Sequence, residues 1–474
     1  MSRSVQRLCV VGAGIGGLAA AALLAARGLE VTVLERAPAV GGKLRFLSPA
    51  NGLTLREVFA ALFEAAGARL EEELALTRQP LLDRFLWPDG QLLDLFDDAE
   101  ATAEAIGAMA GAEAVSAYRG YLSRARQIFE ALAGPFLFSP RPHPLALSMN
   151  PAVALRLGAA ALSPLWEALG GHFRRHPRLR QVFARAAAYV GCSPLLAPAT
   201  LMMISHIERE GVWQVAGGLL RLAEALAQLA ARHGAQIRCG AEVAAIALKG
   251  GRAAGVILRE GGERLGADAV LVNADAMALG AGLFGPEAAR AVPPVAAGAR
   301  SFSAITWPMR ITAGGELLAT QTVLLPDEPT AEYTELQYRH RLPPAPSIQL
   351  ARDGDRLLCM VSAPARADTR PLPAEAIAAC GRHVQERLAG IGVMAEAEGP
   401  PLTPADFAAA FPGTGGALYG AALHGWSAAF QRPAAQSALP GLFLCGGGTH
   451  PGPGVAMAAI SGRLAAAAIL EERL

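Results

Sequence analysis

The chain has 474 residues, which is enough for two to three structural units and a large buried core. Apolar residues make up 52% and charged residues 18%, so long disordered tracts are excluded and an oily globular protein is indicated. The 42 Lys and Arg nearly balance the 41 Asp and Glu. No overall field therefore favours nucleic acid, and we expect no nucleic-acid partner. The six cysteines are scattered without metal-ligand spacing, so we expect reduced thiols and no metal site.

The first 45 residues follow a strand, turn, helix and strand pattern. A β-branched run over 8–11 predicts a strand and the glycine-rich stretch 12–17 predicts a turn. An Ala/Leu-rich helix is expected over 18–27, and a second strand over 31–34. Such a unit is half of a doubly wound parallel sheet, so the fold class is α/β.

Three glycines and one carboxylate of this unit predict a dinucleotide site. Gly12 permits the tight turn, Gly14 lets the backbone approach a pyrophosphate, and Gly17 lets the helix lie close to the strand. Glu35 ends the second strand, where a carboxylate accepts hydrogen bonds from a ribose 2′-hydroxyl. The same glycine spacing recurs over 280–285 without the strand and helix, so we interpret that copy as a helix end and loop.

A glycine doublet, Gly41 and Gly42, follows the second strand and precedes two cations. Two glycines allow the chain to turn beneath a cofactor, and Lys43 and Arg45 would then meet phosphate or ribityl oxygens. The alternative is a loop with solvated charges.

The rest of the chain divides into three further stretches. Residues 56–205 read as mostly helical, with helices expected over 57–66, 99–112, 114–132 and 179–190. The pattern of the N-terminal unit returns over 206–285, and residues 286–434 mix strands and helices as in a sheet-based substrate domain.

The final segment, 435–474, contains a second glycine-rich turn. An expected strand over 442–445 is followed by the loop 446–454, which includes Gly447 and Gly448, and then by a long helix. The backbone N–H groups of Val455, Ala456 and Met457 would lie at the positive end of that helix. They would stabilise negative charge on a bound group; the alternative is an ordinary loop and terminal helix.

Together these segments resemble the FAD-dependent carotenoid desaturases of the bacterial phytoene desaturase type, within the flavin amine oxidase-like superfamily. The resemblance covers nearly the whole chain and rests on residues 11–17, 35, 41–43, 217–218, 239–243, 273–275 and 448–455. Stretches such as 189–194 and 211–213 are most similar to the 1-hydroxycarotenoid 3,4-desaturases, also called hydroxyneurosporene or methoxyneurosporene dehydrogenases.

The resemblance implies an FAD cofactor and assigns residues to it. Gly12, Gly14, Gly17, Glu35 and Arg36 would hold the ADP half, and the backbone at Val243 would contact adenine. The ribityl chain and ring would lie against Gly447, Gly448 and the start of the last helix. It further implies a Rossmann-type FAD-binding domain (1–55, 206–285 and 435–474), an inserted helical lobe (56–205) and a mixed-sheet substrate domain (286–434).

The implied reaction removes a hydride and a proton from a carbon–carbon bond beside the polyene of an acyclic hydroxy- or methoxycarotenoid, and the electrons pass to oxygen or a quinone. Because carotenoids reside in bilayers, we expect a cytoplasmic protein held peripherally on the inner (photosynthetic) membrane. The stretch 172–183, with Arg between bulky apolar residues, is the expected docking face, unless it is a solvated cationic helix face.

Catalytic residues are harder to assign. His450 in the second glycine-rich turn is the candidate base, although a histidine before proline in such a turn is more often a structural hydrogen-bonder. Arg185 and Tyr189 would either touch a substrate oxygen or belong to the packing. Relatives carry an Asp-x-Gly-Pro stretch near the flavin, whereas here residues 51–55 join directly to the next helix. A phytoene desaturase, a carotenoid isomerase, an amine oxidase-like enzyme and a non-catalytic flavin- or carotenoid-binding protein remain alternatives.

Overall fold

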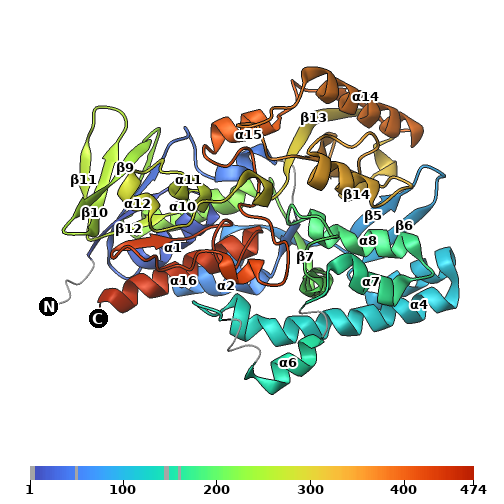
Figure 1. The fold of residues 1–474 in the computed structure, drawn as a ribbon, viewed down its shortest axis with the longest axis horizontal. Coiled ribbons are helices and arrows are strands. Elements are labelled where there is room, and N and C mark those ends of the chain that lie inside the picture. Colours follow the sequence, from blue (N-terminus) through green and yellow to red (C-terminus); the bar gives the residue numbers. More distant parts are fainter. Residues whose placement is uncertain (1–5, 48–51, 144–148, 159–161, 474) are drawn as a thin grey trace.

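The computed structural model describes residues 6–47, 52–143, 149–158 and 162–473. A five-stranded sheet lies at one end, a seven-stranded sheet lies beside it, and a helical lobe packs below the second sheet (Figure 1). All six cysteines are free. In the described part of the chain, no helix combines the length and the hydropathy needed to cross a bilayer.

The five-stranded sheet is parallel throughout, with the spatial order β18, β12, β1, β2, β8. Its strands are β1 (Arg7–Val11), β2 (Glu30–Glu35), β8 (Gln236–Cys239), β12 (Ala269–Val272) and β18 (Leu442–Leu444). The strands expected over 8–11, 31–34 and 442–445 are therefore confirmed. Strand β1 lies between β2 and β12, so the ends of β1, β12 and β18 share one sheet edge, where such sheets bind ligands.

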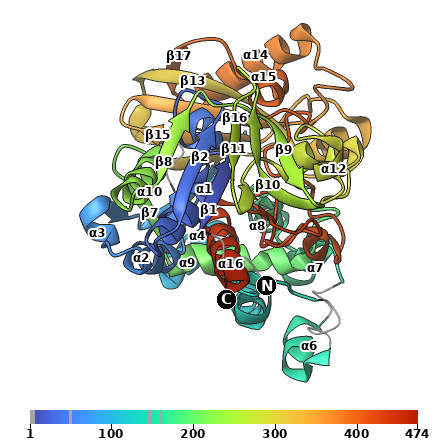
Figure 2. The ribbon, with the colours of Figure 1, turned by 90° about the vertical axis from the view of Figure 1, so that its left-hand side faces the viewer.

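Apolar helices cover one face of this sheet and an antiparallel meander covers the other. The helices are α1 (Ile15–Ala25), α2 (Arg56–Ala65), α10 (Leu220–Arg232) and α16 (Val455–Arg473), which share one buried core. The meander consists of β9 (Val243–Lys249), β10 (Arg252–Leu258) and β11 (Arg264–Gly266). Figure 2 shows β1 and β2 between these layers.

The second sheet is mixed, with the order β17, β13, β16, β15, β14, β5, β6. Its strands are β5 (Leu81–Leu86), β6 (Leu92–Phe96), β13 (Ser303–Ala313), β14 (Gln321–Leu324), β15 (Ile348–Asp353), β16 (Arg356–Ala363) and β17 (Met394–Ala397). Helix α14 (Ala374–Gly390) packs on one face through Cys380, Val384 and Leu388. On the other face, Phe85 and Val323 join the core of the helical lobe.

The helical lobe consists of α4 (Ala99–Leu132), α6 (Pro151–Leu157), α7 (Leu165–Phe173), α8 (Pro177–Ala188) and α9 (Met203–Glu210). Helix α4 is interrupted at Gly111, where φ is +82° and ψ is 178°, so the two helices expected over 99–112 and 114–132 form one element with a kink. The expectation of a mostly helical stretch over 56–205 fails for 81–96, which forms the hairpin β5–β6. Short Leu-rich runs fit either periodicity, and here pairing with β14 and the Arg84–Asp94 ion pair select the strand.

Shorter elements complete the fold. A small antiparallel sheet has the order β3 (Gly52–Thr54), β7 (Val212–Val215), β4 (Leu76–Arg78). Short α-helices are α3 (Leu70–Glu73), α11 (Ala276–Gly280), α12 (Pro286–Ala289), α13 (Ala331–Thr334) and α15 (Pro404–Ala410). The 3-10 and π turns are η1 (Gly42–Phe46), η2 (Ala133–Leu137), η4 (Ala199–Met202), η5 (Ala297–Ala299), η6 (Gly315–Leu317), η7 (Glu335–Arg339) and η8 (Ala428–Gln431). The stretch 280–285 is indeed a helix end followed by turns.

Candidate functional site

The two glycine-rich turns, more than 400 residues apart in sequence, meet at the edge of the parallel sheet. A Cβ built onto Gly16 would lie 3.0 Å from the backbone nitrogen of Gly446. Asn273, which follows β12, lies between them: its Nδ2 donates to the carbonyl of Gly12 at 3.3 Å. Its Oδ1 would lie 3.0 Å from a Cβ on Gly446. The turns therefore form the two sides of a single site.

The turn after β1 has the close packing that a dinucleotide turn requires. Gly12 has φ +100°, in the left-handed region that favours glycine. A Cβ on Gly17 would lie only 2.5 Å from the carbonyl oxygen of Gly12, and one on Gly14 would lie 2.8 Å from Asn273 Nδ2. Only glycine permits this approach of α1 to β1, as the sequence predicts.

Glu35 lies at the end of β2, with 7% of its surface exposed. Its Oε2 accepts a hydrogen bond from the backbone N–H of Ala13, and its Oε1 accepts one from Ala37, both at 2.8 Å. Each carboxylate oxygen keeps a further lone pair for a ribose hydroxyl. Val243 begins β9 and is buried in the same core cluster as Leu34, while Arg36 is exposed and donates to the carbonyl of Ala410 at 3.3 Å.

The glycine doublet touches the first turn. The backbone N–H of Gly41 donates to the carbonyl of Ala13 at 2.9 Å, and a Cβ on Gly42 would lie 3.3 Å from Cα of Gly14. Lys43 forms an ion pair with Asp275 at 3.3 Å and donates to the carbonyl of Leu418 at 2.5 Å. Its ammonium group therefore links η1 to the turn after β12. Arg45 lies beside the ring of Phe46.

Hydrogen bonds of the Thr449 side chain stabilise the second glycine-rich turn, which leads directly into α16. The hydroxyl of Thr449 lies 2.7 Å from the carbonyl of Gly446 and 2.8 Å from the hydroxyl of Ser461. The helix begins at Val455, and Ala458 N–H donates to the carbonyl of Gly454 at 2.9 Å. The preceding N–H groups, at 455–457, have no intrahelical acceptor and form a positively polarised end.

A comparison with protein families decides the nature of this site. Residues 15–470 match the model of the flavin-containing amine oxidoreductases. The chain belongs to this family. The expected flavin cofactor is thereby confirmed, and the dinucleotide turn with Glu35 fits its FAD form.

Two curated relatives match the chain over nearly its full length. Hydroxyneurosporene desaturase of Rubrivivax gelatinosus is 40% identical, over 98% of this chain and 93% of the relative. Hydroxyneurosporene desaturase of Cereibacter sphaeroides is 39% identical, over 100% of this chain and 99% of the relative. The resemblance to the carotenoid desaturases is therefore confirmed.

Among solved structures, cyclohexylamine oxidase of Brevibacterium oxydans superposes with a TM-score of 0.57 at 16% identity, over 99% of both chains. This likeness confirms the expected α/β fold, with a parallel sheet and further sheets beside it.

His450, the candidate base, lies in the second turn of this flavoprotein with 3% of its surface exposed. Its Nε2 lies 2.9 Å from the carbonyl oxygen of Ser139, which requires Nε2 to carry the proton. Phe136 packs against the ring edge to face, with ring centroids 5.0 Å apart. Burial lowers the pKa of His450 to about 4, so the ring is neutral at pH 7. These contacts favour the structural role over general base catalysis.

Arg185 and Tyr189 belong to a buried ion cluster. Arg185 Nη2 lies 2.9 Å from Asp83 and 2.7 Å from Glu208, and Tyr189 donates to Asp83 at 3.0 Å. Burial raises the pKa of Glu208, and the neighbouring guanidinium of Arg185 opposes this shift. The two carboxylates occupy Arg185, so the cluster joins α8 and α9 to β5 as part of the packing.

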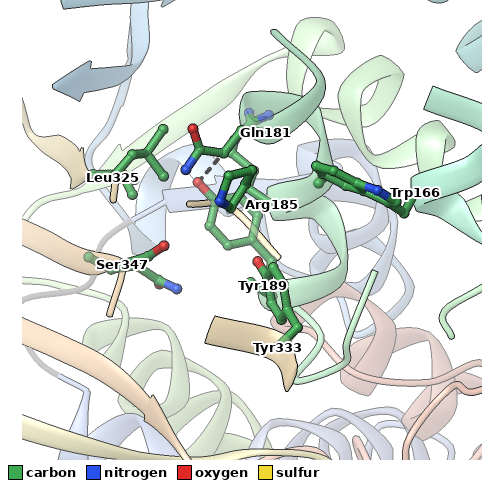
Figure 3. A pocket seen from close by; sticks show the side chains of 12 residues that line it. Trp166, Gln181, Arg185, Tyr189, Leu325, Tyr333 and Ser347 are labelled. Carbon is green, nitrogen blue, oxygen red and sulfur yellow. Dashed lines mark hydrogen bonds between the residues drawn. The ribbon is translucent and has the colours of Figure 1, made fainter. Parts of the chain in front are cut away.

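A narrow cavity of about 20 Å³ lies beside this cluster, between α8 and the strands β14 and β15 (Figure 3). That volume is room for a water molecule. Tyr189 and Tyr333 line one side of it, and Ser347 lies across from them. The cavity is too small for a polyene.

The structure contradicts the expected docking face over 172–183 and describes only part of the connection over 51–55. The stretch 172–183 is not an apolar docking face, because Phe173, Leu179, Val182 and Phe183 are at most 2% exposed and form the core of the helical lobe. Bulky apolar residues alternate with Arg there because one helix face is buried. The expected absence of the Asp-x-Gly-Pro stretch over 51–55 is not tested by the structure. Asn51 lies outside the described residues, and Gly52–Thr54 form β3, which pairs with β7.

Two charged residues of the site, Asp275 and Arg432, were assigned no role from the sequence. Asp275 holds Lys43, and Arg432 donates to the carbonyl of Gly447 at 2.8 Å. The polar residues Asn273 and Asp275 directly after a buried strand were a signal for Asp275, because strand ends of parallel sheets carry functional groups. Arg432 precedes Pro433 in an irregular stretch and gave no signal.

Proposed function

We propose that this chain is an FAD-dependent desaturase of acyclic hydroxy- or methoxycarotenoids in carotenoid biosynthesis. The observation that carries the proposal is the junction of both glycine-rich turns around Asn273, in a chain 40% identical to a hydroxyneurosporene desaturase. A phytoene desaturase is the second candidate, because a phytoene dehydrogenase of Streptomyces griseus is 29% identical over 99% of this chain.

The residues of the first turn would hold the ADP half of FAD. Gly12, Gly14 and Gly17 bring backbone N–H groups and the start of α1 to the pyrophosphate. Glu35, which accepts the backbone N–H of Ala13, would also accept a hydrogen bond from the ribose, and Val243 would border the adenine. Arg36 lies at the exposed rim of the same end.

The second turn would hold the ribityl chain and the ring. Gly447, Gly448 and the free N–H groups at 455–457 provide close approach and hydrogen-bond donors, and Gly42, Lys43 and Arg45 border the site from η1. The bound flavin supplies a hydride acceptor next to the bond that is oxidised. The protein aligns the polyene, excludes water and lets the released proton leave.

The direct test is reconstitution of the FAD-loaded protein with vesicles that contain 1-hydroxyneurosporene, under air or with an added quinone. We expect a product with two hydrogen atoms fewer and a longer-wavelength absorption band, and bleaching of the flavin when no acceptor is present. Geometric isomers without loss of hydrogen would favour the isomerase. A flavin that never bleaches with any carotenoid would favour a non-catalytic binding protein.

We also propose that the protein docks peripherally on the lipid surface where its substrate resides. Among the described residues, the three most exposed large apolar side chains are Met149 (72%), Leu155 (84%) and Leu162 (69%), all at or near α6. The sequence from 138 to 166 contains Arg141 and Arg156 and no acidic residue, which suits an anionic bilayer.

Capping and packing contacts fix helix α6 so that its apolar side chain Leu155 stays exposed. The Asn150 side chain accepts from Ala152 N–H at 3.1 Å, and Arg124 donates to the carbonyls of Arg156 and Leu157. Val153 and Leu157 anchor it in the core of the helical lobe. Figures 1 and 2 show α6 projecting below the rest of the molecule.

A further inference from the structure

Arg432 is a buried cation, and no carboxylate of a described residue forms an ion pair with it. Its relative exposure is 6%. Nη1 donates to the carbonyl of Gly447 at 2.8 Å, while Nη2 donates to those of Tyr419 at 3.1 Å and Ala421 at 2.7 Å. Its Nε has no hydrogen-bond partner among the described residues. Burial lowers the pKa of the guanidinium, but arginine stays protonated in proteins.

The guanidinium lies inside the second glycine-rich turn. It contacts Gly447 on one limb, and a Cβ on Gly452, on the other limb, would lie 3.8 Å from Nε. This turn leads into the N-terminus of α16, which is itself positively polarised. Two sources of positive potential therefore act on the same turn, and neither has an anionic side chain as a direct partner in the described chain.

The carboxylate nearest to Arg432, that of Asp275, is paired with another cation. Asp275 flanks Gly420 together with Arg432: a Cβ on Gly420 would lie 3.6 Å from Asp275 Oδ1 and 3.7 Å from Arg432 Nη1. The carboxylate of Asp275 is ion-paired with Lys43 at 3.3 Å. The three groups together carry a net charge of +1, in a site where burial keeps electrostatic interactions strong.

We propose that Arg432 is a positioning residue that makes the flavin site electropositive and so raises the reduction potential of the bound FAD. Hydride transfer from a neutral carotenoid adds one negative charge to the cofactor, and the matching proton leaves from the neighbouring carbon. A fixed cation beside the turn stabilises the charged product more than the neutral reactant. The inference rests on the proposed placement of the flavin ring against this turn, and not on the identity of the carotenoid.

The test is the midpoint potential of FAD in the purified holoenzyme without substrate, measured by spectroelectrochemistry for three variants. Arg432→Met removes the charge, Arg432→Lys keeps it while losing most of the hydrogen bonds, and Arg352→Met is the matched control. Arg352 on β15 also donates to backbone carbonyls, those of Gly315, Leu318 and Gly354, away from the flavin turns.

We expect Arg432→Met to shift the ratio of reduced to oxidised FAD at least tenfold toward the oxidised form, which is about 30 mV for a two-electron couple. Arg432→Lys should keep most of the native potential, and Arg352→Met all of it. An unchanged potential in Arg432→Met, or equal shifts in the Met and Lys variants, would overturn the proposal.

The outcome with poorly folded variants is also decisive. If Arg432→Met loses FAD, the potential of Arg432→Lys decides between charge and structure. If both variants lose FAD, the guanidinium is a structural clamp of the turn and the electrostatic role is wrong. A shifted potential in a protein that never desaturates a carotenoid would refute the proposed function and leave this inference standing.

Discussion

The carboxylate of Glu35 accepts the backbone N–H of Ala13 at 2.8 Å, which ties the end of β2 to the turn after β1. Its other oxygen accepts the N–H of Ala37 at the same distance. The residue is therefore part of the protein structure at the position where it would bind ribose. Substitution of Glu35 tests both roles.

Glu35→Ala should weaken FAD binding and destabilise the turn. Two N–H groups lose their acceptor, at a cost of about 1–3 kcal/mol for each one that stays buried, and the ribose loses its own acceptor. Glu35→Gln keeps one carbonyl oxygen and should show an intermediate effect. Flavin fluorescence titration of the apoprotein measures the affinity for FAD. Equal affinities in the parent protein, Glu35→Ala and Glu35→Gln would mean that Glu35 does not bind FAD.

Gly17→Ala tests the approach of α1 to β1. The new Cβ would lie 2.5 Å from the carbonyl oxygen of Gly12, so the helix must shift, at a cost of about 1–3 kcal/mol and with loss of FAD. Gly120, exposed on α4 with no atom near its Cβ position, is the control. Gly120→Ala should instead stabilise the protein by about 1 kcal/mol. Thermal unfolding with and without FAD compares them, and similar effects would contradict the packing argument.

The parallel sheet and its two turns could be predicted because local pattern and tertiary role coincide there. Gly12, Gly14, Gly17 and Glu35 are identified by spacing along a strand, turn and helix, and the structure places them as that spacing requires. The hairpin β5–β6 could not be predicted, since its partner β14 lies more than 200 residues away.

The prediction of a docking face over 172–183 was wrong because the sequence does not show which helix face is buried. The sequence 172–183 shows alternating Arg and apolar residues, which fit a lipid-facing or a core-facing helix equally well. Only packing decides that Phe173 and Phe183 stack with centroids 5.2 Å apart inside the lobe. Arg432 was missed because its partners are backbone carbonyls of Tyr419, Ala421 and Gly447, which no sequence pattern displays.

His450→Gln should keep most of the desaturation rate. The Gln amide can still donate to the carbonyl of Ser139, and a ring with a pKa of about 4 contributes little as a base at pH 7. A general base would be worth about 10²- to 10⁴-fold. The measurement is kcat/KM between pH 5.5 and 8, and a loss above 100-fold with native FAD absorbance would establish His450 as catalytic.

Glu332 should make the stability of the protein depend on pH. It is 3% exposed and accepts from the Ser347 hydroxyl at 2.6 Å and from its N–H at 3.1 Å, and burial raises its pKa from 4.5 to about 7. The folded state therefore binds this proton more tightly than the unfolded state. The contribution of Glu332 to the free energy of unfolding is therefore greatest below pH 4.5. It decreases as the pH rises to 7, by up to about 3 kcal/mol.

Glu332→Gln should remove this dependence, so that the variant gains on the parent protein between pH 5 and 8 in thermal unfolding. Glu335 is the matched control, because its hydrogen bond with Arg341 lowers its pKa. Glu335→Gln should show no such gain with rising pH. A constant difference between Glu332→Gln and the parent protein would mean that Glu332 is ionised throughout the range.

Membrane docking through α6 predicts that exposed apolar side chains there contribute to vesicle binding. The double substitution Met149→Ser with Leu155→Ser removes two side chains that are 72% and 84% exposed. Burial of one such side chain in lipid contributes about 1.5–3 kcal/mol, so we expect at least a tenfold loss of affinity in vesicle co-sedimentation. Arg156→Gln should weaken binding only to vesicles with anionic lipid, by about 1 kcal/mol.

The control is Met394→Ser, 56% exposed on β17, which lies at the end of the molecule opposite α6 (Figure 2). It should bind vesicles like the parent protein, because an exposed apolar residue matters only where the surface meets lipid. Far-ultraviolet circular dichroism checks that all variants are folded. Equal losses for the β17 and α6 variants would mean that binding is nonspecific, and no loss for the α6 variant would place the docking surface elsewhere on the chain.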